Sequence, residues 1–200
     1  MKKIMLLLSV LGIAGCNTIE EKKSAALESV LQKTAGIDTD IDNLKNSGKN
    51  KADMNITDDG LNLNERFKNG FGTVTATKES IALTISNEES GQDNILIGFT
   101  GTDLTKARPV KGKLNTGGDN SMSFGIANYK NNEADIMTAF DVEGAILSLK
   151  PEKTVIRLKG KIGYSEDASK PGKWKIFEGI ITLNYPVFQA LGNAKEDFVY

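Results

Sequence analysis

Asp141 and Glu143 are the side chains best placed for acid–base chemistry in this chain of 200 residues. They are two positions apart, so on a strand they would share a face with about 6 to 7 Å between them. Hydrolysis of a glycosidic bond uses two carboxyl groups at a controlled separation. Gly144 follows directly, so a turn between two strands is an equal alternative, and no sign of a cleft or an aromatic sugar platform accompanies the pair. A carboxylate-dependent glycan hydrolase is therefore an alternative hypothesis, and we expect no enzyme.

The composition excludes most other catalytic and metal-binding devices. The chain has no histidine and one cysteine, so nucleophilic machinery of the serine–histidine and cysteine–histidine kinds is absent. A single cysteine cannot close a disulfide within the chain, and a zinc site built from nitrogen and sulfur ligands is excluded as well. We expect no catalytic residues, no metal and no cofactor.

Two acidic segments match calcium-binding loops only in part. The first has acids at the first three ligand positions of an EF-hand, but it lacks the required glycine and the closing glutamate; it comprises Asp38, Asp40, Asp42, Asn43 and Lys49. The second has the glycine but ends on arginine; it comprises Asn55, Thr57, Asp59, Gly60 and Arg66. Neither is an EF-hand. We interpret both as solvated loop carboxylates, with a looser calcium site as the alternative.

The only cysteine, Cys16, follows a short segment typical of an export signal. Residues 1–3 form a positively charged start, and residues 4–13 are mostly apolar but too few to span a bilayer as a helix. The small residues that follow lead directly to the cysteine. The tetrapeptide resembles the lipobox of bacterial lipoproteins, in which leucine is more common at the first position; it reads Ile13-Ala14-Gly15-Cys16.

This resemblance implies that residues 1–15 are a lipoprotein signal peptide and that Cys16 becomes the first mature residue. Its thiol would carry a diacylglycerol, and acyl chains such as palmitate would hold the protein to a membrane. Asn17 stands where an aspartate tends to retain such lipoproteins at the inner membrane, so the resemblance favours the outer membrane if the source is Gram-negative. A free or buried thiol behind an ordinary signal peptide is the alternative. The resemblance covers residues 1–17 alone.

Residues 16–69 are expected to form a helical stem followed by a polar connector. Thr18 and Glu21 fit a capping box at the start of a helix over residues 18–35. Apolar residues recur at spacings of three and four, as in a coiled-coil seam, at Leu27, Val30, Ile37, Ile41 and Leu44. A glycine interrupts this pattern, so a helical or partly disordered stem is the preferred interpretation. Residues 46–69 are polar without a sustained apolar period and are expected to be a loop-like connection.

Residues 70–200 are expected to form a mainly β domain, an antiparallel β-sandwich or barrel with a short C-terminal tail. The hydrophobic period changes to two, and turn-forming residues separate the segments. We expect strands at residues 71–77, 81–86, 95–100, 110–114, 121–128, 134–140, 145–150, 154–164 and 174–185. Short strands at this spacing without intervening helices favour an antiparallel arrangement. Residues 187–191 are expected to form a short helical turn.

A cationic segment is the most informative feature of the charge distribution. Residues 150–175 carry a net charge of +5, whereas removing Lys2 and Lys3 from the 25 basic residues leaves a mature chain with 23 basic and 26 acidic side chains. If the strands around residues 155–161 and 173–177 pair as a hairpin, these positive charges gather on one face. Such a face would steer toward an anionic surface or an acidic partner. The candidate binding residues are Arg157, Lys159, Lys161, Lys173, Trp174 and Lys175.

Plain structural interpretations of the same residues remain open. Lysines on one face of a strand can be solvated side chains that protect the sheet from edge-to-edge association, and Trp174 can be a core anchor. One strand shows the pattern best: Ile156, Leu158, Ile162 and Tyr164 fall on one face and Arg157, Lys159 and Lys161 on the other. We expect the first face to be buried and the second to be exposed to solvent.

Together with the lipobox resemblance, these features predict a lipid-anchored cell-envelope protein with a non-enzymatic binding or structural β domain. The expected partners are a membrane, through the acyl chains on Cys16, and an envelope protein or an anionic surface such as lipid headgroups or lipopolysaccharide. The charge balance predicts no nucleic-acid partner. A periplasmic inhibitor or immunity lipoprotein is the alternative within the same class.

Overall fold

The computed structural model describes residues 49–87, 93–102, 104–106, 108–114, 120–130 and 133–191. The expected signal peptide, Cys16 and the helical stem lie outside these residues, as do the acidic residues of the first of the two acidic segments. Within the described part of the chain, no helix is long and apolar enough to cross a membrane.

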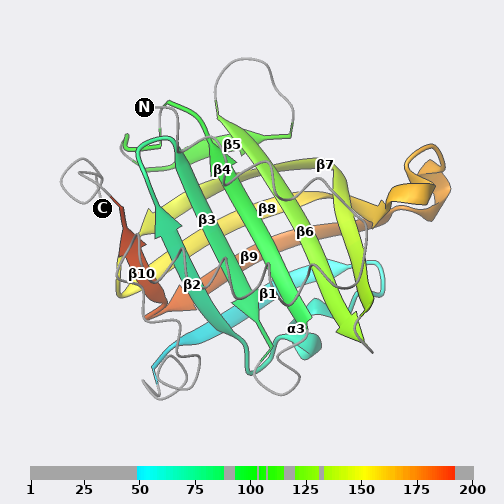
Figure 1. Cartoon of the computed structure of the whole chain (residues 1–200), viewed down its shortest axis with the longest axis horizontal. Helices are drawn as coiled ribbons and strands as arrows, with labels where there is room; N and C mark the ends of the chain where they lie inside the picture. The colour runs from blue at the N-terminus through cyan, green and yellow to red at the C-terminus, as the bar shows by residue number, and fades with distance from the viewer. Residues whose placement is uncertain are drawn as a thin grey trace. The chain divides into compact units, whose positions relative to one another are not determined.

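The described residues form one curled sheet of ten strands, a half-barrel (Figure 1). Its order is β1-β9-β8-β7-β5-β6-β4-β3-β2-β10, with an additional β7–β6 pairing. The strands are β1 (Lys51–Asp58), β2 (Phe71–Ala76), β3 (Ser80–Ser86), β4 (Asp93–Thr100), β5 (Val110–Lys113), β6 (Ser121–Lys130), β7 (Glu133–Leu149), β8 (Lys153–Tyr164), β9 (Lys175–Asn184) and β10 (Val187–Ala190). One short helix, α3 (Leu63–Arg66), and two 3-10 turns complete the described elements. The expectation of a mainly β domain is confirmed, and the sheet is mixed because β10 runs parallel to β2.

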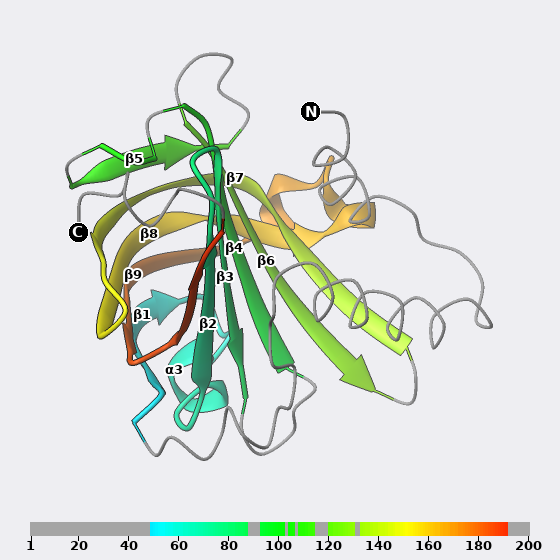
Figure 2. The same cartoon turned by 60° about the vertical axis from the view of Figure 1, so that its left-hand side comes forward.

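The core lies on the concave face of the curled sheet. Figure 2 shows β2, β3, β4 and β6 on one side of the curl and β8, β9 and β1 on the other, with β7 passing from β6 to β8. Strand β8 has the expected alternation, because Ile156, Leu158 and Ile162 are buried whereas the basic residues between them are exposed. Phe124 and Phe177 stack across the interior with their ring centroids 4.5 Å apart. The period-two pattern therefore identified the inner face correctly.

Strand β7 bends the sheet, and one expected boundary is wrong there. We expected two strands, at residues 134–140 and 145–150, but the chain continues as one strand of 17 residues. The register against β8 shifts between Ala139 and Asp141 and again between Ile146 and Ser148; such bulges bend and twist a strand. On β8, a side chain at Gly160 would place its Cβ 2.3 Å from the Asp141 carbonyl oxygen. The acidic residues and glycine of this segment therefore form a bend within a strand.

Residues 51–58 overturn the expected polar connector. They form β1, which pairs with β9 over all eight residues, so the sheet begins at Lys51 and not near residue 70. The sequence signal is weak because the inward residues include only one branched apolar side chain, Ile56, beside Ala52 and Met54. Pairing with β9 supplies the backbone hydrogen bonds that the local sequence does not favour strongly.

Two asparagine amides seal the free edge of β1. The side chain of Asn64 accepts from the Ile56 N–H at 3.0 Å and donates to the Ile56 carbonyl oxygen at 2.8 Å. Asn50 makes the same pair of bonds with Gly72 of β2, both at 2.9 Å. A backbone bond from Ala52 N–H to the Gly70 carbonyl oxygen lies between them. Because an open strand edge is a template for association, these amides both close the half-barrel and block that edge.

Replacing Asn64 by Asp is expected to destabilise the domain by about 1 to 3 kcal/mol. The carboxylate keeps the acceptor for the Ile56 N–H but has no donor, so the Ile56 carbonyl oxygen loses its partner and faces a negative charge. Urea unfolding of the full chain measures the effect. An exposed amide on the same segment provides the control, since Asn62→Asp removes no side-chain hydrogen bond described for that residue. Equal free energies of unfolding for the two variants would contradict the sealing role.

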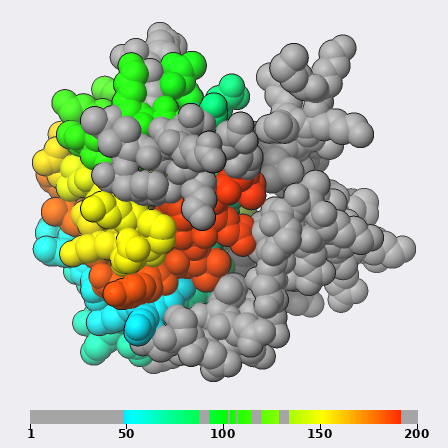
Figure 3. All heavy atoms as spheres, turned by 90° about the vertical axis from the view of Figure 1, so that its left-hand side faces the viewer, coloured from blue at the N-terminus to red at the C-terminus, as the bar shows by residue number. Residues whose placement is uncertain are grey.

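The segment after β9 corrects a second expectation. Residues 187–191 were expected to form a helical turn, but β10 runs parallel to β2, with Val187 opposite Thr73. Tyr185 adopts a left-handed backbone conformation, with φ at 45°, and its N–H donates to the Glu152 carbonyl oxygen at 2.9 Å. In the space-filling view of Figure 3, the red atoms of β10 accordingly lie beside yellow and orange atoms of the preceding strands. Reversal at Tyr185 thus places the apolar residues of β10 against β2, where sheet pairing is available.

Candidate functional site

The predicted basic residues of β8 lie on the convex face, within a ladder of alternating charges. Lys159 is flanked in register by Glu143 of β7 and Glu178 of β9, and its Nζ lies 2.9 Å from Glu143 Oε1. Lys161 likewise has Asp141 as its neighbour on β7. The hairpin of β8 and β9 forms as expected. It brings acidic residues from both neighbouring strands between the lysines, which a sum of charges along the sequence does not reveal.

The Glu143 and Lys159 pair shows what chemistry this face favours. The hydrogen bond and charge of Lys159 lower the pKa of the Glu143 carboxyl, and Glu143 in turn raises the pKa of the Lys159 ammonium. A general acid in glycoside hydrolysis needs a carboxyl whose pKa is raised. Glu143 is shifted in the opposite direction, on an open convex face, so this arrangement matches a surface ion pair.

The convex face of β5, β7, β8 and β9 nevertheless has an excess of positive charge. The two lysines of β5 are exposed and join it through pairing with β7, an addition that the sequence did not indicate. The basic residues are Lys111, Lys113, Lys153, Arg157, Lys159 and Lys161, and the acidic residues are Asp141, Glu143 and Glu178. We call these nine residues the cationic face. In contrast, strands β2, β3, β4 and β6 have charged residues only at their ends, Asp93 and Lys130.

The connection between β8 and β9 holds Lys173 and Trp174 through internal contacts. This connection, at the right of Figure 1, contains the 3-10 turns Ser165–Asp167 and Pro171–Lys173. The Asp167 carboxylate lies 3.0 Å from Lys170 Nζ and 3.1 Å from Lys173 Nζ, and hydrogen bonds from these two lysines lower its pKa. Trp174 donates its indole N–H to the Asp167 carbonyl oxygen at 2.9 Å, and its ring centroid lies 5.0 Å from that of Phe140. Lys173 and Trp174 therefore stabilise this connection. Lys175 is exposed at the start of β9, but it pairs with the inward-facing Ile162 and so lies on the opposite side of the sheet from Lys159 and Lys161, contrary to expectation.

The second acidic segment, proposed above as a partial calcium loop, uses its carboxylates to hold the backbone. Asp58 accepts hydrogen bonds from the N–H groups of Leu61, Asn62 and Leu63. Asp59 accepts from the Ile176 N–H at 3.1 Å. Among the residues that the structure describes, no group of three or more His, Cys, Asp or Glu side chains is arranged to hold a metal ion.

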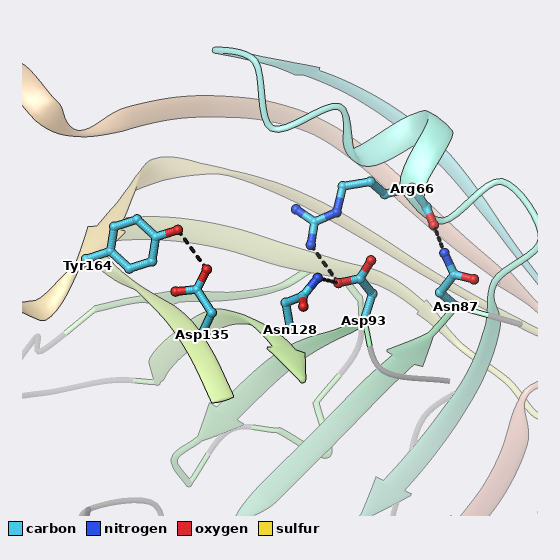
Figure 4. Close-up of polar contacts among 6 residues, drawn as sticks. All are labelled: Arg66, Asn87, Asp93, Asn128, Asp135 and Tyr164. Atoms are coloured by element: carbon cyan, nitrogen blue, oxygen red, sulfur yellow. Dashed lines mark hydrogen bonds and ion pairs between the residues drawn. The ribbon is translucent and has the colours of Figure 1, made fainter. Parts of the chain in front are cut away.

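A polar cluster that the sequence did not indicate lies at one end of the half-barrel (Figure 4). It lies where β4 and β7 begin and β6, β8 and α3 end, so the topology brings five elements together. Arg66 Nη2 lies 2.9 Å from Asp93 Oδ1, Asn128 Nδ2 donates to the same oxygen, and the Tyr164 hydroxyl donates to Asp135 Oδ2 at 3.0 Å. We call these residues the end cluster. No motif links them, because each comes from a different element.

The environment of Tyr164 makes its titration a probe of the end cluster. Burial, followed by the hydrogen bond and charge of Asp135, raises the pKa of the Tyr164 phenol, and Arg66 opposes this shift. The ordinary pKa of a tyrosine is about 10. The folded state therefore favours the neutral phenol, and this contribution to stability is present below about pH 10 and is lost as the pH rises through the folded-state pKa.

Asp135→Asn is expected to move the titration of Tyr164 to lower pH, because the negative charge that disfavours the phenolate is removed. Ultraviolet absorbance of the full chain at rising pH measures this, and Tyr164→Phe identifies which of the four tyrosines gives the latest transition. Ser123→Ala, on the other face of β6, should leave the curve unchanged. A latest transition that persists in Tyr164→Phe would contradict the assignment.

Comparison with known proteins adds no identification to this geometry. A scan against protein-family models, a search of curated proteins and a search of solved structures each found no match to the chain. A curled β-sheet alone does not determine a function, because one fold supports many unrelated functions. The function is therefore inferred from the charged surface and the polar clusters of this structure.

Proposed function

We propose that this chain is a lipid-anchored cell-envelope protein whose β domain is a non-enzymatic binding module for an anionic partner. The anchor is supported by the lipobox resemblance at Cys16, which favours an outer-membrane position if the source is Gram-negative. The binding role is supported by one observation, the excess of positive charge on the cationic face. Lipid headgroups, lipopolysaccharide or an acidic envelope protein supply the matching negative charge.

The acidic residues of the cationic face weaken its electrostatic attraction to an anionic partner. Three carboxylates lie among six basic groups, so the field is weaker than the basic residues alone would produce. Each basic side chain near an anionic membrane contributes about 1 kcal/mol, and the attraction is screened beyond about 8 Å at physiological salt. Weak, salt-dependent binding is therefore expected from this face alone.

Tethering would make such weak binding effective. Between Cys16 and Lys51 there is enough chain to place the domain within about 30 to 35 Å of its anchor if that segment behaves as a coil. A tether of this length gives an effective concentration on the order of 1 mM at the membrane surface. A cationic face with millimolar affinity would then be engaged for a large fraction of the time.

Replacing Arg157 and Lys161 together by Gln is expected to weaken binding to anionic vesicles about tenfold, since each loses about 1 kcal/mol of attraction or less. These two residues are chosen because Lys159 is paired with Glu143, and its removal would free that carboxylate. Cosedimentation of the mature chain, residues 16–200 with Cys16→Ser, with phosphatidylglycerol vesicles at several salt concentrations measures the affinity. This form has neither the apolar leader nor acyl chains, so neither contributes to the binding.

The control carries the same change in net charge on the other half of the convex surface. Thr75→Glu with Thr84→Glu lowers the net charge by two, as the Gln variants do, but on β2 and β3. Unchanged binding in this control and lost binding in the Gln variants supports the proposal. Equal loss in both pairs reduces the effect to net charge, and loss in the control alone assigns binding to the uncharged face; either outcome rejects the cationic face as the binding surface.

A further inference from the structure

The end cluster is recessed and lies on the concave face of the sheet. Asp93 and Asn128 belong to the same alternation as the buried residues of β4 and β6, and the two are paired in register. Exposure falls from Asp135, which is exposed, through the Arg66 side chain at 28% to the Asp93 side chain at 13%. Figure 4 shows the side chains of Arg66 and Tyr164 directed toward one another across Asn128 and Asp135. Solvent therefore reaches a polar floor from one side.

One atom on this floor lacks the partner that a buried oxygen needs. Asn128 Oδ1 is buried and makes no hydrogen bond to any described residue. The amide cannot be turned around, because its nitrogen donates to the Asp93 carboxylate, and a reversed amide would place its oxygen against that negative charge. Buried polar atoms are normally paired with protein, water or ligand. The fixed acceptor, which has no partner among the described residues, is available to a donor on a bound ligand.

The remaining groups of the end cluster define what that donor belongs to. Arg66 uses one of its five N–H groups on Asp93 and offers others, so the cluster presents donors beside the acceptors Asn128 Oδ1 and Asp135. A hydroxyl group is both donor and acceptor and fits either role. Arg66 and Asp93 balance each other, and Asp135 leaves the end cluster with a negative charge that repels an anionic ligand. A cationic ligand could pair with Asp135 but has no acceptor for the remaining N–H groups of Arg66, whereas a neutral ligand with several hydroxyl groups serves both.

Apolar surface lies next to these polar groups. Phe67 lies beneath the Arg66 guanidinium, which is 5.8 Å from the Phe67 ring centroid, but Phe67 is fully buried and offers no surface itself. Met137 is the register partner of Tyr164 and is only partly buried. A ligand with hydroxyl groups on one side and C–H groups on the other matches this combination, as a sugar ring does. We propose that the end cluster is a binding site for a saccharide unit, with Asn128 and Asp135 accepting from its hydroxyl groups and Arg66 donating to them.

The test uses the full mature chain and defined small probes. Methyl glucoside, methyl galactoside and N-acetylglucosamine are titrated while the side-chain amide signal of Asn128 and the ring signals of Tyr164 are followed by NMR. A few hydrogen bonds in a partly open site predict a dissociation constant on the order of 1 mM. Saturable shifts at both residues with at least one of these sugars are expected. Acetate and ethylammonium, which carry one charge each, should give none.

Matched variants distinguish binding at this site from nonspecific binding and from the effects of unfolding. Asn128→Ala should weaken sugar binding about tenfold, and Tyr164→Phe, which removes a single hydroxyl, provides a milder second variant with an expected loss of about threefold. Ser123→Ala on the outer face of β6 should bind as the parent does. No saturable shift with any of the three sugars at about 100 mM, or equal shifts with the charged probes, overturns the inference. The Gln variants at Arg157 and Lys161 should bind sugar normally, so this result stands apart from the test of the cationic face.

Discussion

Replacing Cys16 by Ser, with an ordinary cleavable export signal in place of residues 1–15, should release the mature protein from the membrane almost completely. If the lipobox resemblance holds, Cys16 carries a diacylglycerol, and a buried acyl chain contributes about 0.8 kcal/mol per CH₂ group. Two chains then contribute on the order of 10 kcal/mol or more, far beyond what the cationic face can supply. Fractionation of cells that produce each form measures the change, and mass spectrometry of the parent should find residues 1–15 absent and the cysteine acylated.

A neighbouring substitution controls for effects on export. Thr18→Ser retains the thiol and the preceding segment, so it should remain at the membrane. Native protein that still contains its leader, or that carries an unmodified thiol, would refute the anchor. The Cys16→Ser form also tests how the two contacts combine. Any residual attachment should disappear at high salt if the cationic face alone holds it, because exposed charges are screened beyond about 3 Å at 1 M salt.

The parts of the fold that could be predicted from the sequence are those with a local signal. In β8 the alternation of Ile156, Leu158 and Ile162 with basic residues requires one buried and one solvent-exposed face. The whole pattern is contained in a single segment. The turn-forming segment at Pro151 similarly separates β7 from β8. Such strands need no knowledge of their neighbours, because period and turn chemistry act over a few residues.

The parts that could not be predicted depend on partners far away in the chain. Strand β1 forms because β9 pairs with it and because Asn50 and Asn64 seal its other edge. Strand β10 forms because β2 lies beside it. Neither segment has a strong period of its own, so its structure follows from tertiary pairing.

The two surfaces of functional interest illustrate the same limit. The sequence placed the basic residues of β8 on one face, but it also grouped Lys175 with them, and the acidic residues of β7 alternate with the β8 lysines only after the strands pair. The end cluster has no local signal at all, since Arg66, Asp93, Asn128, Asp135 and Tyr164 are separated by up to 98 positions and meet only at the end of the sheet. A site built from residues at several strand ends can therefore be identified only when the fold is known.

Replacing Gly179 by Ala should be the most damaging single-methyl change in the domain, with a loss of about 3 kcal/mol or more. Gly179 lies on β9 opposite Ile56 of β1. A Cβ there would be 2.1 Å from the Asn55 carbonyl oxygen and 2.6 Å from the Ile56 Cα. Both are backbone atoms, so no side chain can rotate away, and β1 must leave its register along the ladder with β9. Thermal unfolding measures the loss, and hydrogen exchange should show early opening of residues 51–58.

Two other glycines provide matched controls for that prediction. At Gly98 the Cβ would be 2.6 Å from Ser123 Oγ, and at Gly172 nothing lies within 4 Å. A hydroxyl can rotate, and Ala restricts the unfolded chain more than Gly does, so Gly98→Ala and Gly172→Ala should each stay within about 1 kcal/mol of the parent. Because these variants differ from Gly179→Ala only in what the methyl group meets, the comparison isolates the contact with β1. Parent-like stability of Gly179→Ala would show that β1 does not pack on β9, and would also remove the reason why residues 51–58 belong to the sheet.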